Sequence, residues 1–318
     1  MAIIQAVVCK NTSYVFHMLS VARVGYDNAY GAKYRSCHSV DDIAQMQQYH
    51  DLLRVSGGKH IGQLYALLVA LPASLDDYVS LDVFYDYIVH LFRALDRQDA
   101  SLAYASWLTS LPDRPAFGLD IRHIPLVIFA EFQQAILVLC DIFKRNQDIF
   151  TQTIWPEEQE LLRSYVDQLN AALAQHACQD RWQELLGCQW NQDVFHVIIC
   201  NSLLDGPQAI DIASDRDVFQ RSSALQPLCE FISHEFGIYM LKQLLHGILD
   251  PGNILHWKPI EGIAVLYNQL VWDNADKHWH ADVALVNYYK RLREDNPSIS
   301  VAELFSQGLS FYNQPSIP

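Results

Sequence analysis

The sequence predicts a mainly helical protein with a small antiparallel β element, placing it in the α+β class. Apolar residues recur at three- and four-residue spacing through the first half, and one β-branched and aromatic stretch near residue 195 interrupts this pattern before it resumes. The chain has 318 residues, of which 51% are hydrophobic, so it can bury a substantial core in one or two domains. We expect a helical N-terminal region over residues 1–150 and a second region over residues 151–318.

Helical periodicity in the first half predicts four helices. Ser39 is a candidate cap for the first of them, and the last is apolar on nearly all sides, as expected of a helix in the core. Pro156 is expected to open a further helix, because acidic residues follow it and suit a helix N-terminus. The four helices are predicted at residues 41–55, 61–71, 83–95 and 128–143.

The pattern then changes to that of a strand. Residues 194–200 are β-branched and aromatic, and residues 209–213 alternate as a half-exposed strand would. A turn signal at 205–207 separates the two, so we expect an antiparallel hairpin. Helix is predicted again after Ser222 or Ser223, running to about Gly247, a candidate C-cap.

Composition restricts the class of partner and the compartment. Formal net charge is −14, from 22 basic and 36 acidic side chains, which disfavours nucleic acid as a partner. The apolar run at residues 2–8 is too short for a signal peptide or a membrane span, so no membrane association is expected. Seven cysteines form no C-x-x-C pair and no regular framework, which indicates reduced thiols and a cytoplasmic protein.

One motif carries possible chemistry. Residues 234–238 read His-Glu-Phe-Gly-Ile, and Glu261-Gly262-Ile263-Ala264 follows 23 residues later. In the zinc-peptidase signature H-E-x-x-H, two histidines one helical turn apart hold the metal, and the glutamate acts as general base. Ile238 occupies the position of the second histidine and cannot ligate a metal. The motif therefore departs from the signature at one ligand.

These residues resemble the gluzincin family of zinc metallopeptidases, in which a strand hairpin precedes an H-E-x-x-H helix and a second helix bears a glutamate ligand. The likeness covers about residues 190–272 and implies a thermolysin-like core preceded by the helical N-terminal region. By resemblance, His234 is the first zinc ligand, Glu235 the general base and Glu261 the third ligand. Such proteins hold an extended peptide at the sheet edge beside the catalytic helix.

Isoleucine at position 238 leaves the motif with too few ligands for a catalytic zinc ion. A catalytic zinc site generally has three protein ligands and a water, and the motif supplies only two. His278 and His280 are the best candidates for a replacement ligand, although an H-x-H pair is also common in polar surface turns. We therefore expect no cofactor, or weakly bound zinc.

Three functions remain open at this point. The first is a degenerate, non-catalytic metallopeptidase-like protein that binds a peptide or protein partner. The second is an active zinc metallopeptidase or metallohydrolase with a replacement ligand. The third is a structural protein with an accidental motif, in which His234 is a core histidine with Glu235 as its ion pair, and Glu261 lies in the first turn of a helix opened by Pro259. The sequence leaves the oligomeric state undetermined.

Overall fold

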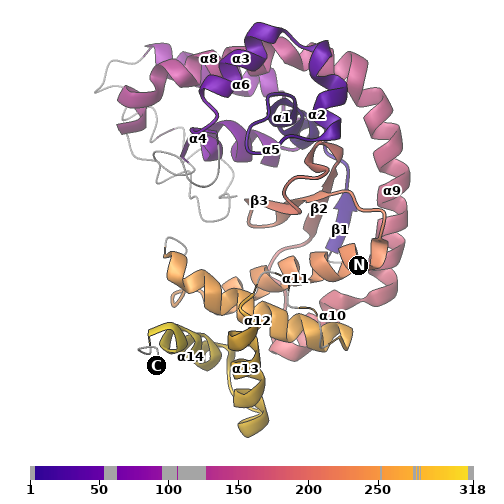
Figure 1. The fold of residues 1–318 in the computed structure, drawn as a ribbon, viewed down its shortest axis with the longest axis vertical. Helices are drawn as coiled ribbons and strands as arrows, with labels where there is room; N and C mark the ends of the chain where they lie inside the picture. The colour runs from indigo at the N-terminus through magenta and orange to yellow at the C-terminus, as the bar shows by residue number, and fades with distance from the viewer. Residues whose placement is uncertain are drawn as a thin grey trace. The chain divides into compact units, whose positions relative to one another are not determined.

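The computed structural model describes residues 4–53, 63–94, 106, 127–250, 253–274, 277, 279 and 281–313. Within these ranges the chain is mainly helical, with one small mixed sheet of four strands (Figure 1). This confirms the predicted α+β class. None of the described helices is long and apolar enough to cross a membrane.

The chain forms two compact units, each built from separate stretches of sequence. The N-terminal unit comprises Ala6–Gln168 and His196–Arg221, and the C-terminal unit comprises Met1–Gln5, Leu169–Phe195 and Ser222–Pro318. This division differs from the predicted boundary at residue 150. Strand pairing and helix packing join segments that are distant in sequence, so residues 196–221 group with the N-terminal helices.

The helices predicted at 41–55, 61–71, 83–95 and 128–143 overlap described helices, although the first ends at Gln48 and the two helices before it were not predicted. Of the predicted ranges, residues 54–55, 61–62 and 95 lie outside the described residues. Ser39 caps its helix as expected, since its Oγ accepts a hydrogen bond from the backbone N–H of Asp41 at 3.2 Å. A π-helical stretch, η4, joins α8 to α9 without a loop, so Pro156 lies within a continuous helical run. The elements are α1 (Lys10–Val21), α2 (Ala29–Tyr34), η1 (Arg35–Cys37), α3 (Val40–Gln48), α4 (Gln63–Tyr65), η2 (Ala66–Ala70), α5 (Leu71–Ser74), α6 (Leu81–Ala94), α8 (Val127–Ile149), η4 (Phe150–Ile154) and α9 (Trp155–His176), which spans the division between the units.

The sheet differs from the predicted antiparallel hairpin. Its strands are β1 (Ile4–Val7), β2 (Phe195–Cys200), β3 (Ala209–Ala213) and β4 (Arg216–Gln220), in the order β1-β2-β4-β3. β4 lies between β2 and β3 and pairs in parallel with β2 and antiparallel with β3. The sheet is therefore mixed, and β2 and β3 are not neighbours. β2 reads as a continuous apolar run because it is an interior strand, almost completely buried.

The C-terminal unit packs five helices around the motif residues. These are α10 (Cys178–Leu186), α11 (Leu225–Leu244), α12 (Ile254–Trp272), α13 (Val283–Asp295) and α14 (Val301–Asn313). Asn253 caps α12, since its Oδ1 accepts a hydrogen bond from the backbone N–H of Leu255 at 3.0 Å. Pro259 therefore lies inside α12, and the expectation that it opens the helix is wrong. Glu261 is consequently beyond the first turn, where the helix dipole no longer explains an acidic residue.

Candidate functional site

His234 and Glu261 meet across the contact between α11 and α12. The Nε2 atom of His234 lies 3.2 Å from Oε2 of Glu261. His234 is 2% exposed, whereas the side chain of Glu261 is 33% exposed, so the pair lies at the edge of the core. The structure therefore brings together the first and third residues of the predicted ligand set. It also gives His234 an acidic partner on the facing helix, in place of the neighbouring Glu235.

A close contact with α10 explains the glycine in the motif. A Cβ atom on Gly237 would lie 2.1 Å from Cζ2 of Trp182, so only glycine lets the indole pack against α11. The indole Nε1–H of Trp182 donates to Ser233 Oγ at 2.9 Å, and Ser233 Oγ donates to Asn268 Oδ1 at 2.7 Å. These bonds tie α10, α11 and α12 together beside His234.

The glycine after Glu261 also has a packing role. A Cβ atom on Gly262 would lie 2.9 Å from side-chain atoms of both Leu285 and Tyr289 on α13. The small residue therefore allows α12 to approach α13. Gly237 and Gly262 are both explained by helix packing, independently of any metal.

Apolar and aromatic side chains surround His234. Its ring centroid lies 6.4 Å from that of Phe231 and 5.9 Å from that of Trp279, and both contacts are stacked. Ile238, the residue in the position of the second histidine, is 4% exposed. The hydrocarbon at position 238 is thus part of the core.

The hydrogen bonds of His234 define its tautomer. A carboxylate only accepts hydrogen bonds, so Nε2 of His234 carries the proton that faces Glu261. Nδ1 is buried and has no hydrogen-bond partner among the described residues. In zinc sites the arrangement is the reverse, because a bare ring nitrogen binds the metal while the other N–H donates to a second group.

The described part of the chain offers this site no third side chain that could bind a metal. No further histidine, cysteine, aspartate or glutamate there completes a group of three with His234 and Glu261. His278 and His280, the predicted replacement ligands, lie outside the described residues. The described site therefore holds two candidate ligands in direct contact.

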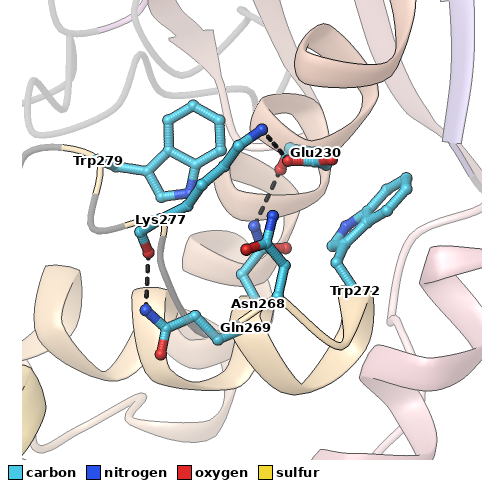
Figure 2. A pocket seen from close by; sticks show the side chains of 7 residues that line it. Glu230, Asn268, Gln269, Trp272, Lys277 and Trp279 are labelled. Carbon is cyan, nitrogen blue, oxygen red and sulfur yellow. Dashed lines mark hydrogen bonds and ion pairs between the residues drawn. The ribbon is translucent and has the colours of Figure 1, made fainter.

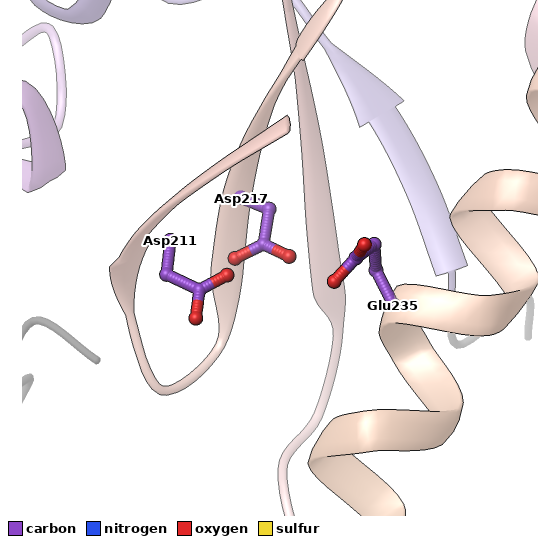
Figure 3. Close-up of side chains that lie close together, drawn as sticks. All are labelled: Asp211, Asp217 and Glu235. Carbon is purple, nitrogen blue, oxygen red and sulfur yellow. The ribbon is translucent and has the colours of Figure 1, made fainter. Parts of the chain in front are cut away.

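Glu235 and a pair of aspartates are drawn in Figure 3. Glu235 is on α11 and is half-buried. Asp211 on β3 lies directly opposite Asp217 on β4, with carboxylate oxygens within 4.8 Å of each other and Asp217 fully buried. Sequence reasoning missed this aspartate pair, because β4 was not predicted. The only available signal was the aspartate at the centre of the alternating segment 209–213.

A small polar pocket adjoins the His234 site in the C-terminal unit (Figure 2). Glu230, 5% exposed, forms an ion pair with Lys277, whose ammonium lies 5.4 Å from the ring centroid of Trp279. Gln269 donates from Nε2 to the Lys277 carbonyl at 2.7 Å. The free volume of about 10 Å³ is no larger than one water molecule needs. Its lining residues are Glu230, Asn268, Gln269, Trp272, Asn274, Lys277 and Trp279.

Comparison with protein-family models, curated protein sequences and solved structures finds no match for this chain.

Proposed function

We propose that this chain is a non-catalytic, metallopeptidase-like protein in which a direct His234–Glu261 contact replaces the zinc ion, and that it binds a peptide or protein partner. The observation that carries the proposal is the direct contact of His234 Nε2 with Oε2 of Glu261 at 3.2 Å, with no hydrogen-bond partner for Nδ1 among the described residues. The gluzincin-like arrangement of the two facing helices, α11 and α12, belongs to this proposal.

Zinc binding at this site carries two energetic penalties. The proton on Nε2 of His234 would have to move to Nδ1, which is buried and has no acceptor among the residues that the structure describes, and an unsatisfied donor there costs about 1–3 kcal/mol. Ile238 supplies no ligand, which leaves the metal with His234 and Glu261 alone. Both penalties favour the hydrogen-bonded pair over the metal.

The edge of the sheet is the proposed partner surface. β3 is one of the two terminal strands in the order β1-β2-β4-β3. A terminal strand presents backbone groups that an extended peptide can pair with by strand addition. In an antiparallel ladder, successive residues of a strand point their backbone N–H and C=O groups alternately toward and away from the neighbouring strand. Gln208 accepts a hydrogen bond from the N–H of Gln220, so its backbone groups point toward β4. The N–H of the next residue, Ala209, therefore points away from β4. Ala209 is also half-buried and small, which allows a guest strand to approach.

Metal content tests the first part of the proposal. The purified full-length protein should contain much less than stoichiometric zinc, and chelators should leave its melting temperature unchanged. Glu261→Gln keeps a carbonyl acceptor for His234, so it should retain most of the stability, whereas Glu261→Ala should lose about 0.5–1.5 kcal/mol. Stoichiometric zinc that is lost in Glu261→Gln would instead establish a metal site with Glu261 as a ligand and direct attention to His278 and His280.

Strand addition is tested by hydrogen exchange on the full chain with peptides selected from a random extended library. Bound peptide should slow exchange in Ala209–Ala213. Ala209→Pro removes an outward N–H without removing a β3–β4 hydrogen bond, so it should abolish this binding and preserve the fold. Peptide binding that is unchanged in Ala209→Pro would contradict the proposed surface.

A further inference from the structure

Two histidines form a direct, buried hydrogen bond in the N-terminal unit. Nε2 of His17 on α1 lies 2.8 Å from Nε2 of His38, which follows η1. Nδ1 of His17 lies 2.9 Å from the Tyr30 hydroxyl, and Nδ1 of His38 lies 2.7 Å from Oδ1 of Asn146. His17 is 0% exposed and His38 is 5% exposed. Each of the four ring nitrogens therefore has a partner inside the protein.

The contacts of Asn146 determine the direction of every bond in this chain. Its Nδ2 donates to Asp42 Oδ2 and to the Ile142 carbonyl, both at 2.8 Å, so its Oδ1 is an acceptor. His38 must then carry its proton on Nδ1 and accept at Nε2. His17 in turn donates from Nε2 and accepts at Nδ1 from the Tyr30 hydroxyl. The result is a one-way relay from Tyr30 to Asp42 through two neutral histidines.

A further proton requires this arrangement to change. At Nε2 of His38 it would face the N–H of His17, and at Nδ1 of His17 the Tyr30 hydroxyl would have to turn from donor to acceptor. Burial holds the pKa of His17 well below its usual range, with a further contribution from His38. Burial also lowers the pKa of His38, although Asn146 and Asp42 oppose this shift.

Among the neighbouring titratable groups, Asp42 favours a charge on His38, but Asn146 lies between its carboxylate and that ring. Asp42 is bound to Asn146 and to Arg145, so its charge is already paired at the end of the relay. Tyr34 lies 5.9 Å from the ring of His17, and its hydroxyl donates to Glu158 at 2.9 Å. The titratable groups that face the pair are Tyr30 and Tyr34 from α2, Asp42 from α3, Arg145 from α8 and Glu158 from α9.

We propose that the His17–His38 pair is an acid-sensitive latch that holds α1, α2, α3 and α8 together in the N-terminal unit. The latch is closed while both rings are neutral, because the relay from Tyr30 to Asp42 crosses all four helices. Acid favours any opened state in which the rings reach water and take up protons. The stabilisation is complete above a pH of about 6.5, the ordinary value for histidine, and is lost as the pH falls below it.

Hydrogen exchange of α1 and α8 amides in the full chain tests the latch. After correction for intrinsic exchange rates, wild-type protection should fall by about fivefold to thirtyfold from pH 6.5 to pH 5.5, since one or two protons are taken up. The double variant His17→Gln, His38→Gln should lose this pH dependence. His90→Gln, which removes an exposed histidine from α6, should retain it. Equal pH dependence in the wild type and the double variant would overturn the proposal.

Nitrogen-15 chemical shifts provide a measurement that does not depend on a variant folding. At pH 6, His17 should be the neutral Nε2–H tautomer and His38 the neutral Nδ1–H tautomer. The second is the rarer form in water, so its detection would support the relay. Detection of the Nε2–H tautomer at His38, or of either ring titrating at the ordinary histidine value, would refute the latch.

Discussion

Nε2 of His234 lies 3.2 Å from Oε2 of Glu261, which is both a hydrogen-bond distance and close to the spacing of two ligands on one tetrahedral zinc. The residues thus lie where a metal could join them, yet they contact each other directly. Restoring the missing imidazole is therefore the most direct test of the site.

Ile238→His should create zinc-dependent stability. Position 238 lies one turn after His234 on the same face of α11, so a histidine there can reach the same point. The apo protein should lose about 1–3 kcal/mol, because a buried hydrocarbon is replaced by a polar ring. Melting with and without zinc measures both effects. Ile238→Gln serves as the control, since it introduces polarity without a good zinc ligand; zinc stabilising both variants equally would argue against a shared metal position.

Gly237→Ala should destabilise the protein despite the higher helix propensity of alanine. The new Cβ would lie 2.1 Å from Cζ2 of Trp182, which cannot move without breaking its bond to Ser233. Overpacking of this kind costs about 1–3 kcal/mol, whereas propensity alone would stabilise the helix by about 0.5–1 kcal/mol. Chemical denaturation measures the change in the free energy of unfolding and shows which of the two effects is larger. In a double-mutant cycle, Trp182→Phe should relieve part of the loss, and strict additivity would show that the indole is not the obstacle.

Asp77→Asn should weaken the start of α1. The helix has no side-chain cap of its own at Cys9, and the Asp77 carboxylate instead accepts from the N–H groups of Lys10 and Asn11, each at 2.9 Å. Loss of the anionic acceptor should cost about 0.5–2 kcal/mol and increase amide exchange in the first turn. Asp51→Asn, an exposed change in the same unit, should have little effect. An equal loss in both variants would exclude a specific capping role.

Alkaline pH should destabilise the folded protein through its buried thiols. Burial raises the pKa to about 11 for Cys178 and Cys200, and to about 12 for Cys9 and Cys229. Because the unfolded chain loses these protons first, this contribution to stability is complete below a pH of about 8.5 and declines as the pH rises above it. Denaturation curves across this range measure the decline.

Alkylation of the native protein offers a separate check on the thiols. At pH 8.5, iodoacetamide should modify the exposed Cys37 before the buried cysteines, which should react only after unfolding in urea. In Cys37→Ser the rapid phase should disappear. Native modification of Cys178 or Cys200 at the rate of Cys37 would mean that these thiols are accessible.

Local patterns predicted much of the fold. The periodicity at 83–95 located α6 (Leu81–Ala94), and Ser39 marked the start of α3, because helix period and capping depend on residues within one or two turns. The same reasoning missed β4 and assigned Pro259 to a helix start. β4 is defined by pairing with two other strands, and α12 begins at Ile254 because Asn253 caps it.

By itself, the sequence determined the α+β class, most of the helices and the candidate pair His234 and Glu261. Only the tertiary structure decided how those residues are used, because their partners come from other elements. The indole of Trp182 leaves room only for glycine at position 237, and Leu285 and Tyr289 do the same at position 262. Asn146, from a distant helix, is the partner of His38 Nδ1. The spacing of apolar residues in the sequence indicates which face of a helix is buried. Which side chains contact that face depends on packing between segments that are distant in sequence.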